Sequence, residues 1–150
     1  MKLRKADKKD FEGYYKLKKE EEIDYSKIIH KKIPSLSKKE YKKDFDKILS
    51  SKKNTLIFTE ENRFLAGFLY GTTYGNKKEG RGYVEVLFIS RKFRRKGIAS
   101  LLINRFITIL KQKGYKRIQL SVNTQNKGAI KLYEKLGFKL HHYELKKEWE

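Results

Sequence analysis

A short basic turn, Arg94-Arg95-Lys96-Gly97-Ile98-Ala99, carries the most specific chemistry in this sequence. It lies between an apolar run at 84–89 and a helical pattern at 98–113. A turn that leads into a helix leaves the first backbone N–H groups of the helix unpaired, at the positive end of the helix dipole. The small residues at 97 and 99 let an anion approach the backbone, and three cations stand beside it. The turn therefore predicts a phosphate-binding site.

The segments around this turn predict a strand, a helix, a second strand and a second helix. The run at 84–89 is the first strand, and the residues from 98 to 113 form a largely apolar helix that ends at Gly114. Ile118, Leu120 and Val122 alternate with polar residues, as in a strand, and a helix follows at about 127–136. A crossover of this length implies that the two strands are parallel.

The remaining segments complete the order βααβββαβαβ, which means a mixed sheet with helices on both faces. They are a strand at 3–5, a helix from Asp7 or Asp10 to about Glu22, an irregular stretch at 25–36, a helix begun by the capping box Ser37-Lys38-Lys39-Glu40, paired strands at 55–59 and 64–73, and an alternating strand from Phe138 to Trp149.

Length and composition predict one domain over residues 1–150, without a disulfide or a bound metal. The chain has no cysteine and three histidines, and it lacks an apolar stretch long enough to cross a membrane. We therefore expect a cytoplasmic protein. The net charge of +20 favours weak, nonspecific association with nucleic acid or the ribosome, but lysine is spread over nearly every segment, as on an ordinary lysine-rich surface.

A second motif follows the parallel crossover, in the segment from Asn126 to Phe138. Asn126, Ala129, Tyr133, Gly137 and Phe138, together with the basic turn, make the chain resemble the GNAT (Gcn5-related N-acetyltransferase) superfamily, whose pyrophosphate loop reads Q/R-x-x-G-x-G/A. The resemblance covers essentially the whole chain. It implies an α/β (α+β) fold with a mixed, mostly antiparallel central sheet of six to seven strands and helices on both faces.

The resemblance also implies acetyl-CoA as co-substrate, with no metal. The loop at 94–99 would surround the pyrophosphate through its backbone. The strand at 84–89 would pair with the pantetheine arm and supply an oxyanion donor from 87–89. Asn126 would contact the cofactor arm or simply cap its helix. The residues implied at the cofactor are Leu87, Phe88, Ile89, Arg94, Arg95, Lys96, Gly97, Ile98, Ala99, Ser100, Asn126 and Tyr133.

Two side chains are candidates for catalysis. Tyr133 stands where many relatives hold a general acid beside the CoA sulfur; the alternative is an aromatic packing residue. Glu85 is the candidate general base for the attacking amine, or else a solvated residue of its strand. The acidic run of Glu20-Glu21-Glu22 and Asp24 is either a docking surface for a cationic amine or a solvated helix end.

The resulting hypothesis is acetyl transfer to a primary amine by direct attack in a ternary complex. A protein N-terminus or a lysine is the first acceptor, and a polyamine-like or aminoglycoside-like molecule is the alternative. A module that binds CoA or nucleic acid without catalysis is the alternative of another class. About a dozen residues follow Gly137, so the last strand pair of the family is missing or short, or a partner chain completes the sheet edge, and the protein is a monomer or a homodimer.

Overall fold

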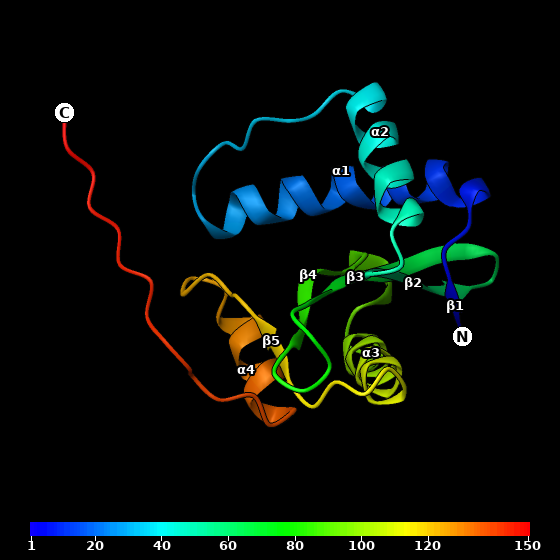
Figure 1. The fold of residues 1–150 in the computed structure, drawn as a ribbon. Coiled ribbons are helices and arrows are strands. Elements are labelled where there is room, and N and C mark those ends of the chain that lie inside the picture. The colour runs from blue at the N-terminus through cyan, green and yellow to red at the C-terminus, as the bar shows by residue number, and fades with distance from the viewer.

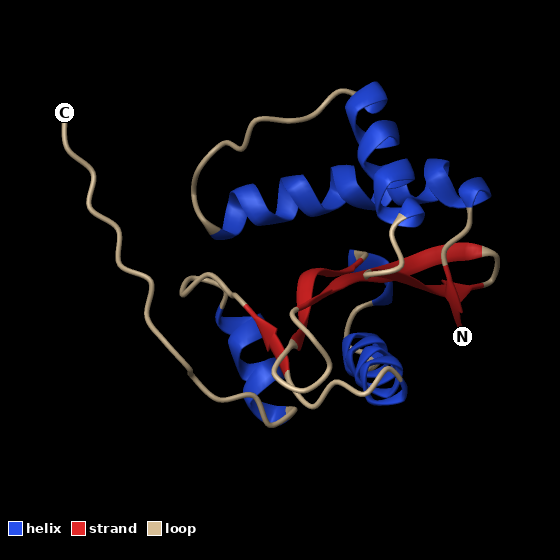
Figure 2. Cartoon of the chain, viewed as in Figure 1, coloured by secondary structure: helices blue, strands red, loops and turns tan.

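A single five-stranded sheet, in the spatial order β1-β2-β3-β4-β5, forms the centre of the molecule (Figures 1 and 2). The computed structural model describes residues 1–150. Strands β1 to β4 pair antiparallel, and β4 pairs parallel with β5, as the crossover predicts. The strands are β1 (Lys2–Lys5), β2 (Asn54–Glu61), β3 (Phe64–Tyr74), β4 (Arg81–Ile89) and β5 (Ile118–Leu120), and the helices are α1 (Phe11–Ile28), α2 (Lys38–Ser50), α3 (Ile98–Gln112) and α4 (Lys127–Lys135).

Helices cover both faces of the sheet, and each face has its own hydrophobic core. Helices α1 and α2 lie on one face, and α3 and α4 lie on the other (Figure 1). The first core includes the fully buried rings of Phe45, Phe58 and Phe68, and the second is built around Leu102 and Phe106 of α3. The predicted mixed, mostly antiparallel sheet is confirmed, with five strands in place of six to seven.

Local sequence signals explain where several elements begin. Ser37 caps α2 by accepting a hydrogen bond from the Glu40 N–H at 3.2 Å, and the Glu40 carboxylate accepts one from the Ser37 N–H at 2.7 Å. The predicted capping box is therefore confirmed. Asn62 and Arg63 turn β2 into β3, both with positive φ, as tight hairpin turns require.

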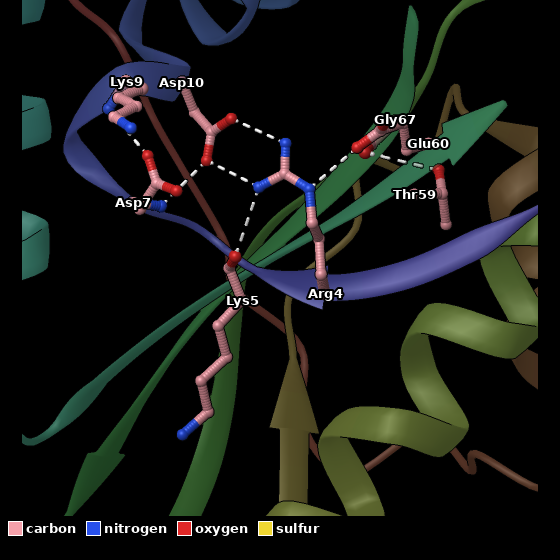
Figure 3. Close-up of polar contacts among 8 residues, drawn as sticks. All are labelled: Arg4, Lys5, Asp7, Lys9, Asp10, Thr59, Glu60 and Gly67. Atoms are coloured by element: carbon pink, nitrogen blue, oxygen red, sulfur yellow. Dashed lines mark hydrogen bonds and ion pairs between the residues drawn. The ribbon is translucent and has the colours of Figure 1, made fainter. Parts of the chain in front are cut away.

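A polar network fixes the first strand to the start of α1 (Figure 3). The Arg4 guanidinium donates two hydrogen bonds to the Asp10 carboxylate, at 2.7 and 2.8 Å, and a third to Glu60 of β2 at 2.8 Å. Asp10 also accepts from the Asp7 N–H at 2.8 Å. Burial would raise the pKa of Asp10, but the bonds from Arg4 and the Asp7 backbone outweigh it and hold that pKa below its usual range.

The structure corrects two predictions about segment ends. Helix α1 continues to Ile28, so the acidic run lies within the helix and the irregular stretch is shorter than predicted. The strand predicted from Phe138 to Trp149 is absent, and this segment runs away from the sheet (Figure 1). Its alternating side chains have no neighbouring strand to pair with; Leu140 is 71% exposed and Trp149 is 83% exposed.

None of the helices combines the length and the apolar character that crossing a membrane requires.

Candidate active site

Strand β4 parts from β5 at a β-bulge, and this opens the site. Tyr70 of β3 pairs with Val86 while Gly71 pairs with Val84, so Glu85 is the extra residue of β4. The parallel pairing with β5 ends at the same place, with Val84 opposite Leu120. From Glu85 to Ile89, β4 therefore has no strand on its β5 side. Bulges of this kind commonly redirect a strand beside an active site.

A cavity of about 450 Å³ lies where the two strands part. The end of β4, the basic turn, the first turn of α3 and the facing side of α4 line it. The structure thus brings together nearly all of the residues predicted at the cofactor: Leu87, Phe88, Ile89, Arg94, Arg95, Gly97, Ile98, Ala99, Ser100, Asn126 and Tyr133. Lys96 is not among the lining residues, and its ammonium group pairs with Glu61 at 3.2 Å.

The backbone of the turn is shaped to receive an anion. Gly97 is the N-cap of α3, with φ of +73°, and a Cβ placed there would meet no atom within 4 Å. The first hydrogen bond of the helix runs from the Leu101 N–H to the Gly97 carbonyl at 3.1 Å. The N–H groups of residues 98–100 therefore have no partner within the helix. Glycine supplies both the left-handed turn and the open space in front of these donors.

The cations of the turn have different surroundings. Arg94 folds back: its Nε donates to the Ile89 carbonyl at 2.9 Å, and its Nη2 donates to Asp24 of α1. The Arg95 side chain is exposed and makes no hydrogen bond or ion pair with the protein. Its φ of +66° is a left-handed conformation that costs a non-glycine residue free energy. Arg95 is thus the cation of the turn left free to meet a phosphate.

Helix α4 supplies the opposite wall of this cavity. Asn126 caps the helix, accepting from the Ala129 N–H at 3.2 Å, and it also lines the cavity. Tyr133 packs edge-on against Phe138, with ring centroids 5.7 Å apart. Burial raises the pKa of Tyr133 above its usual value near 10, so its phenol stays protonated at neutral pH. A protonated phenol can donate a proton to a leaving thiolate.

A second cavity, of about 520 Å³, lies between α1, α2 and the sheet. Glu21 and Tyr25 line both cavities, so the last turns of α1 are a wall common to the two. Sequence reasoning missed this wall because it ended the helix at Glu22. A signal was present, because the helical spacing of Leu17, Glu21, Asp24 and Ile28 continues past Glu22 and neither glycine nor proline occurs between Gly13 and Pro34.

The second cavity is acidic within a very basic chain. The protein has a net charge of +20, but this cavity is lined by three carboxylates and only two lysines. The carboxylates are those of Glu21, Glu22 and Asp44, and the lysines are Lys18 and Lys47. Burial and the charges of Glu21 and Asp44 raise the pKa of Tyr14, which also lines this cavity. A cavity lined by carboxylates and aromatic rings is suited to binding a cation.

The acidic run is not a solvated helix end, because its side chains accept hydrogen bonds from other groups of the protein. Glu20 accepts from the Arg91 N–H at 2.8 Å, and Asp24 accepts from the guanidinium groups of Arg91 and Arg94. Glu22 accepts from the Tyr41 hydroxyl and from Lys19. The run therefore connects α1 to the basic turn and to α2.

Glu85 lies at the margin of the second cavity without lining it. Its carboxylate accepts from the Tyr74 hydroxyl at 2.8 Å, and the side chain is exposed. Burial, with the charges of Glu85 and Asp44, raises the pKa of Tyr70, which does line the cavity. The bulge thus carries a solvent-accessible carboxylate next to the opening between the strands.

Comparison with known proteins agrees with this geometry. The model of the acetyltransferase (GNAT) family matches residues 14–138. The chain belongs to the GNAT acetyltransferase family. A solved structure with a similar fold, that of the aminoglycoside N-acetyltransferase AAC(6')-Iy, is a complex with CoA. No group of three or more histidine, cysteine, aspartate or glutamate side chains is placed to hold a metal ion.

Similar sequences include N-alpha-acetyltransferases. The N-alpha-acetyltransferase MAK3 of Arabidopsis thaliana is 39% identical over 69 residues, which is 43% of this chain and 36% of that protein. The N-alpha-acetyltransferase 30 of Schizosaccharomyces pombe is 27% identical over 84 residues, or 56% of each chain. The chain therefore spans about a third to just over half of the length of these relatives.

Similar solved structures cover nearly the whole chain. A transcriptional regulator from Bacillus halodurans C-125 superposes with a TM-score of 0.82 at 25% identity, covering 99% of both chains. The aminoglycoside 6'-N-acetyltransferase AAC(6')-Ig from Acinetobacter haemolyticus has a TM-score of 0.79 at 16% identity, covering 100% of this chain and 99% of the other. At that identity the second likeness concerns the fold.

Proposed function

We propose that this chain is an N-acetyltransferase that uses acetyl-CoA as co-substrate and acts on the primary amine of a protein, at its N-terminus or at a lysine side chain. The observation that carries the proposal is the acidic cavity that adjoins the cofactor cavity across Glu21 and Tyr25. Lys18 pairs with Glu21 and Lys19 pairs with Glu22, whereas Asp44 makes no ion pair, so Asp44 favours an ammonium group there although the chain as a whole repels cations. The similarity to two N-alpha-acetyltransferases supports a protein N-terminus as the first choice.

Transfer is direct, within a ternary complex of enzyme, acetyl-CoA and amine. The amine nitrogen bonds to the thioester carbonyl carbon, the carbon–sulfur bond breaks, and the acetyl group stays on nitrogen. The chain has no cysteine that could carry the acetyl group in between. Backbone N–H groups at 87–89, where β4 has no β5 neighbour, are the donors we propose for the carbonyl oxygen.

Proton transfer is assigned to two side chains. An amine with a lysine-like pKa of about 10.4 must lose a proton before it attacks, and Glu85 accepts that proton directly or through water. Tyr133 donates its phenolic proton to the CoA sulfur as the carbon–sulfur bond breaks. The place of Tyr133 in the lining of the cofactor cavity supports the second role, and burial raises the pKa of its phenol, so the phenol stays protonated to a higher pH than that of an ordinary tyrosine.

The test follows release of free CoA thiol with a thiol-reactive dye, an assay to which this cysteine-free chain contributes no background. Three matched peptides are compared: a free N-terminus without lysine, a blocked N-terminus with one lysine, and both blocked. Turnover on either of the first two, with none on the third, is the expected result. Turnover confined to spermidine or kanamycin would replace the proposal with a small-molecule acceptor. CoA binding without turnover on any amine would refute it.

A further inference from the structure

Asp24 joins the last turns of α1 to the two ends of the segment that precedes α3. Its carboxylate accepts hydrogen bonds from the guanidinium groups of Arg91 and Arg94, and the residue is only 8% exposed. One turn earlier, Glu20 accepts from the Ser90 hydroxyl at 3.2 Å and from the Arg91 N–H at 2.8 Å. The contacts span about 70 residues of sequence and connect two otherwise separate elements.

These contacts decide where the basic turn sits. Arg94 is the first residue of the turn, and its guanidinium is held between Asp24 and the Ile89 carbonyl, over the ring of Phe88. Because the guanidinium is held at these contacts, the position of the Arg94 backbone is restricted as well. The position of the anion-binding N–H groups in front of Gly97 therefore depends on a carboxylate of another helix.

The same turns of α1 line the cavity proposed for the amine. Glu21 and Tyr25, the neighbours of Asp24 along and around the helix, line both cavities. A displacement of this part of α1 would move the wall of the amine cavity, and a displacement of the turn would move the phosphate donors. The Asp24 contacts tie these two displacements together.

We propose that Asp24 is a positioning residue that couples acetyl-CoA binding to amine binding. The amine half of the proposal rests on the proposed function; the cofactor half rests on the acetyl-CoA site alone. Asp24 lines the cofactor cavity, and both of its carboxylate oxygens are bonded to Arg91 and Arg94, so we assign it a role through these two arginines. Because coupling between two sites is reciprocal, acetyl-CoA tightens the amine site by the same factor by which the amine tightens the acetyl-CoA site.

The test compares Asp24→Asn with Glu12→Gln, an equivalent loss of a carboxylate from the exposed N-terminal part of α1. Calorimetric titration with CoA measures the Kd, and steady-state kinetics measure KM and kcat. We expect Asp24→Asn to raise the Kd for CoA and both KM values about tenfold, with kcat within threefold of the wild type. Glu12→Gln should leave all of them unchanged.

Combining substitutions tests whether Asp24 acts on CoA binding through the two arginines. In an Arg91→Gln/Arg94→Gln background, Asp24→Asn should weaken CoA binding less than twofold further, because both of its partners are already lost. If Asp24→Asn unfolds the chain, Arg91→Gln removes one of the two partners from an exposed position and should raise the Kd about threefold. An unchanged Kd in the folded variants, or fully additive effects of Asp24→Asn and the paired substitutions Arg91→Gln and Arg94→Gln, would overturn the coupling. If the protein acetylates no amine, only the proposed function is refuted, because the CoA titration still tests whether Asp24 supports CoA binding.

Discussion

Replacing Tyr133 with phenylalanine tests the proton-transfer chemistry with the least disturbance of the fold. The ring packs edge-on against Phe138, and phenylalanine keeps that contact. The hydroxyl makes no hydrogen bond to another protein group, so its removal leaves no polar partner unsatisfied. We therefore expect the free energy of unfolding to stay within about 0.5 kcal/mol of the wild type.

The effect on catalysis should be much larger. A positioned general acid contributes roughly 10²- to 10⁴-fold, and loss of a hundredfold in kcat corresponds to about 2.7 kcal/mol of transition-state stabilisation. The KM for acetyl-CoA should change less than threefold, because the phenol acts when the thiolate forms. The pH profile adds a second measurement: the wild-type rate should fall at high pH as Tyr133 ionises, at a pH above the usual tyrosine pKa, and the variant should lack that fall. A kcat within threefold of the wild type would show that Tyr133 serves only as a packing residue.

Three further perturbations test the other assignments. Glu85→Gln should lower kcat/KM for the amine at least tenfold at pH 7 and recover toward the wild type at pH above 9, where more amine is already deprotonated; equal loss at all pH values would exclude a role as base. Gly97→Ala should cost about 1 kcal/mol of stability, because φ is +73°, and should raise the KM for acetyl-CoA about tenfold; an unchanged KM would mean that the phosphate lies elsewhere. Asp10→Asn should cost about 2–3 kcal/mol in urea unfolding at pH 7. Because the folded pKa of Asp10 is depressed, this difference is present above an unfolded pKa of about 3.9 and should disappear as the pH falls through the folded value; a difference that persists at low pH would contradict the ion pair.

Most of the element order was predictable because it rests on local signals. The capping box at Ser37, the turn at Asn62-Arg63 and the apolar period of α3 each specify structure over a few residues. The parallel pairing of β4 with β5 followed from the length of the crossover alone. Such features depend on backbone donors, glycine conformations and side-chain period, which the sequence displays directly.

The parts that the sequence did not predict depend on contacts between distant segments. The end of α1 was predicted too early, at about Glu22, because the apolar set on which the prediction rested ends at Leu17. The carboxylates beyond that point are unfavourable to the dipole of an isolated helix, but Glu20 and Asp24 are paired with groups about 70 residues away. The C-terminal alternation predicted a strand, but alternation gives only a suitable pattern, and a strand also needs a neighbour. The sequence also could not predict that Arg94 pairs with Asp24 while its neighbour Arg95 has no partner in the protein.

The bulge at Glu85 connects these observations into one explanation of the site. An extra residue in β4 increases the local twist, and the β4–β5 pairing ends at the residue before it. The same residue resets the alternation of β4: Val84 packs in the core beneath α3, whereas Val86 and Phe88 pack in the core beneath α1 and α2. A single irregularity therefore opens the cleft, exposes the backbone of 87–89 on its β5 side and sets a carboxylate at the junction. Deleting the bulge residue should therefore abolish the binding of both acetyl-CoA and the amine. Glu85→Gln keeps the bulge, so this variant should bind CoA with unchanged affinity in a calorimetric titration. A loss of CoA affinity in Glu85→Gln would show that the side chain, and not the extra backbone residue, maintains the cleft.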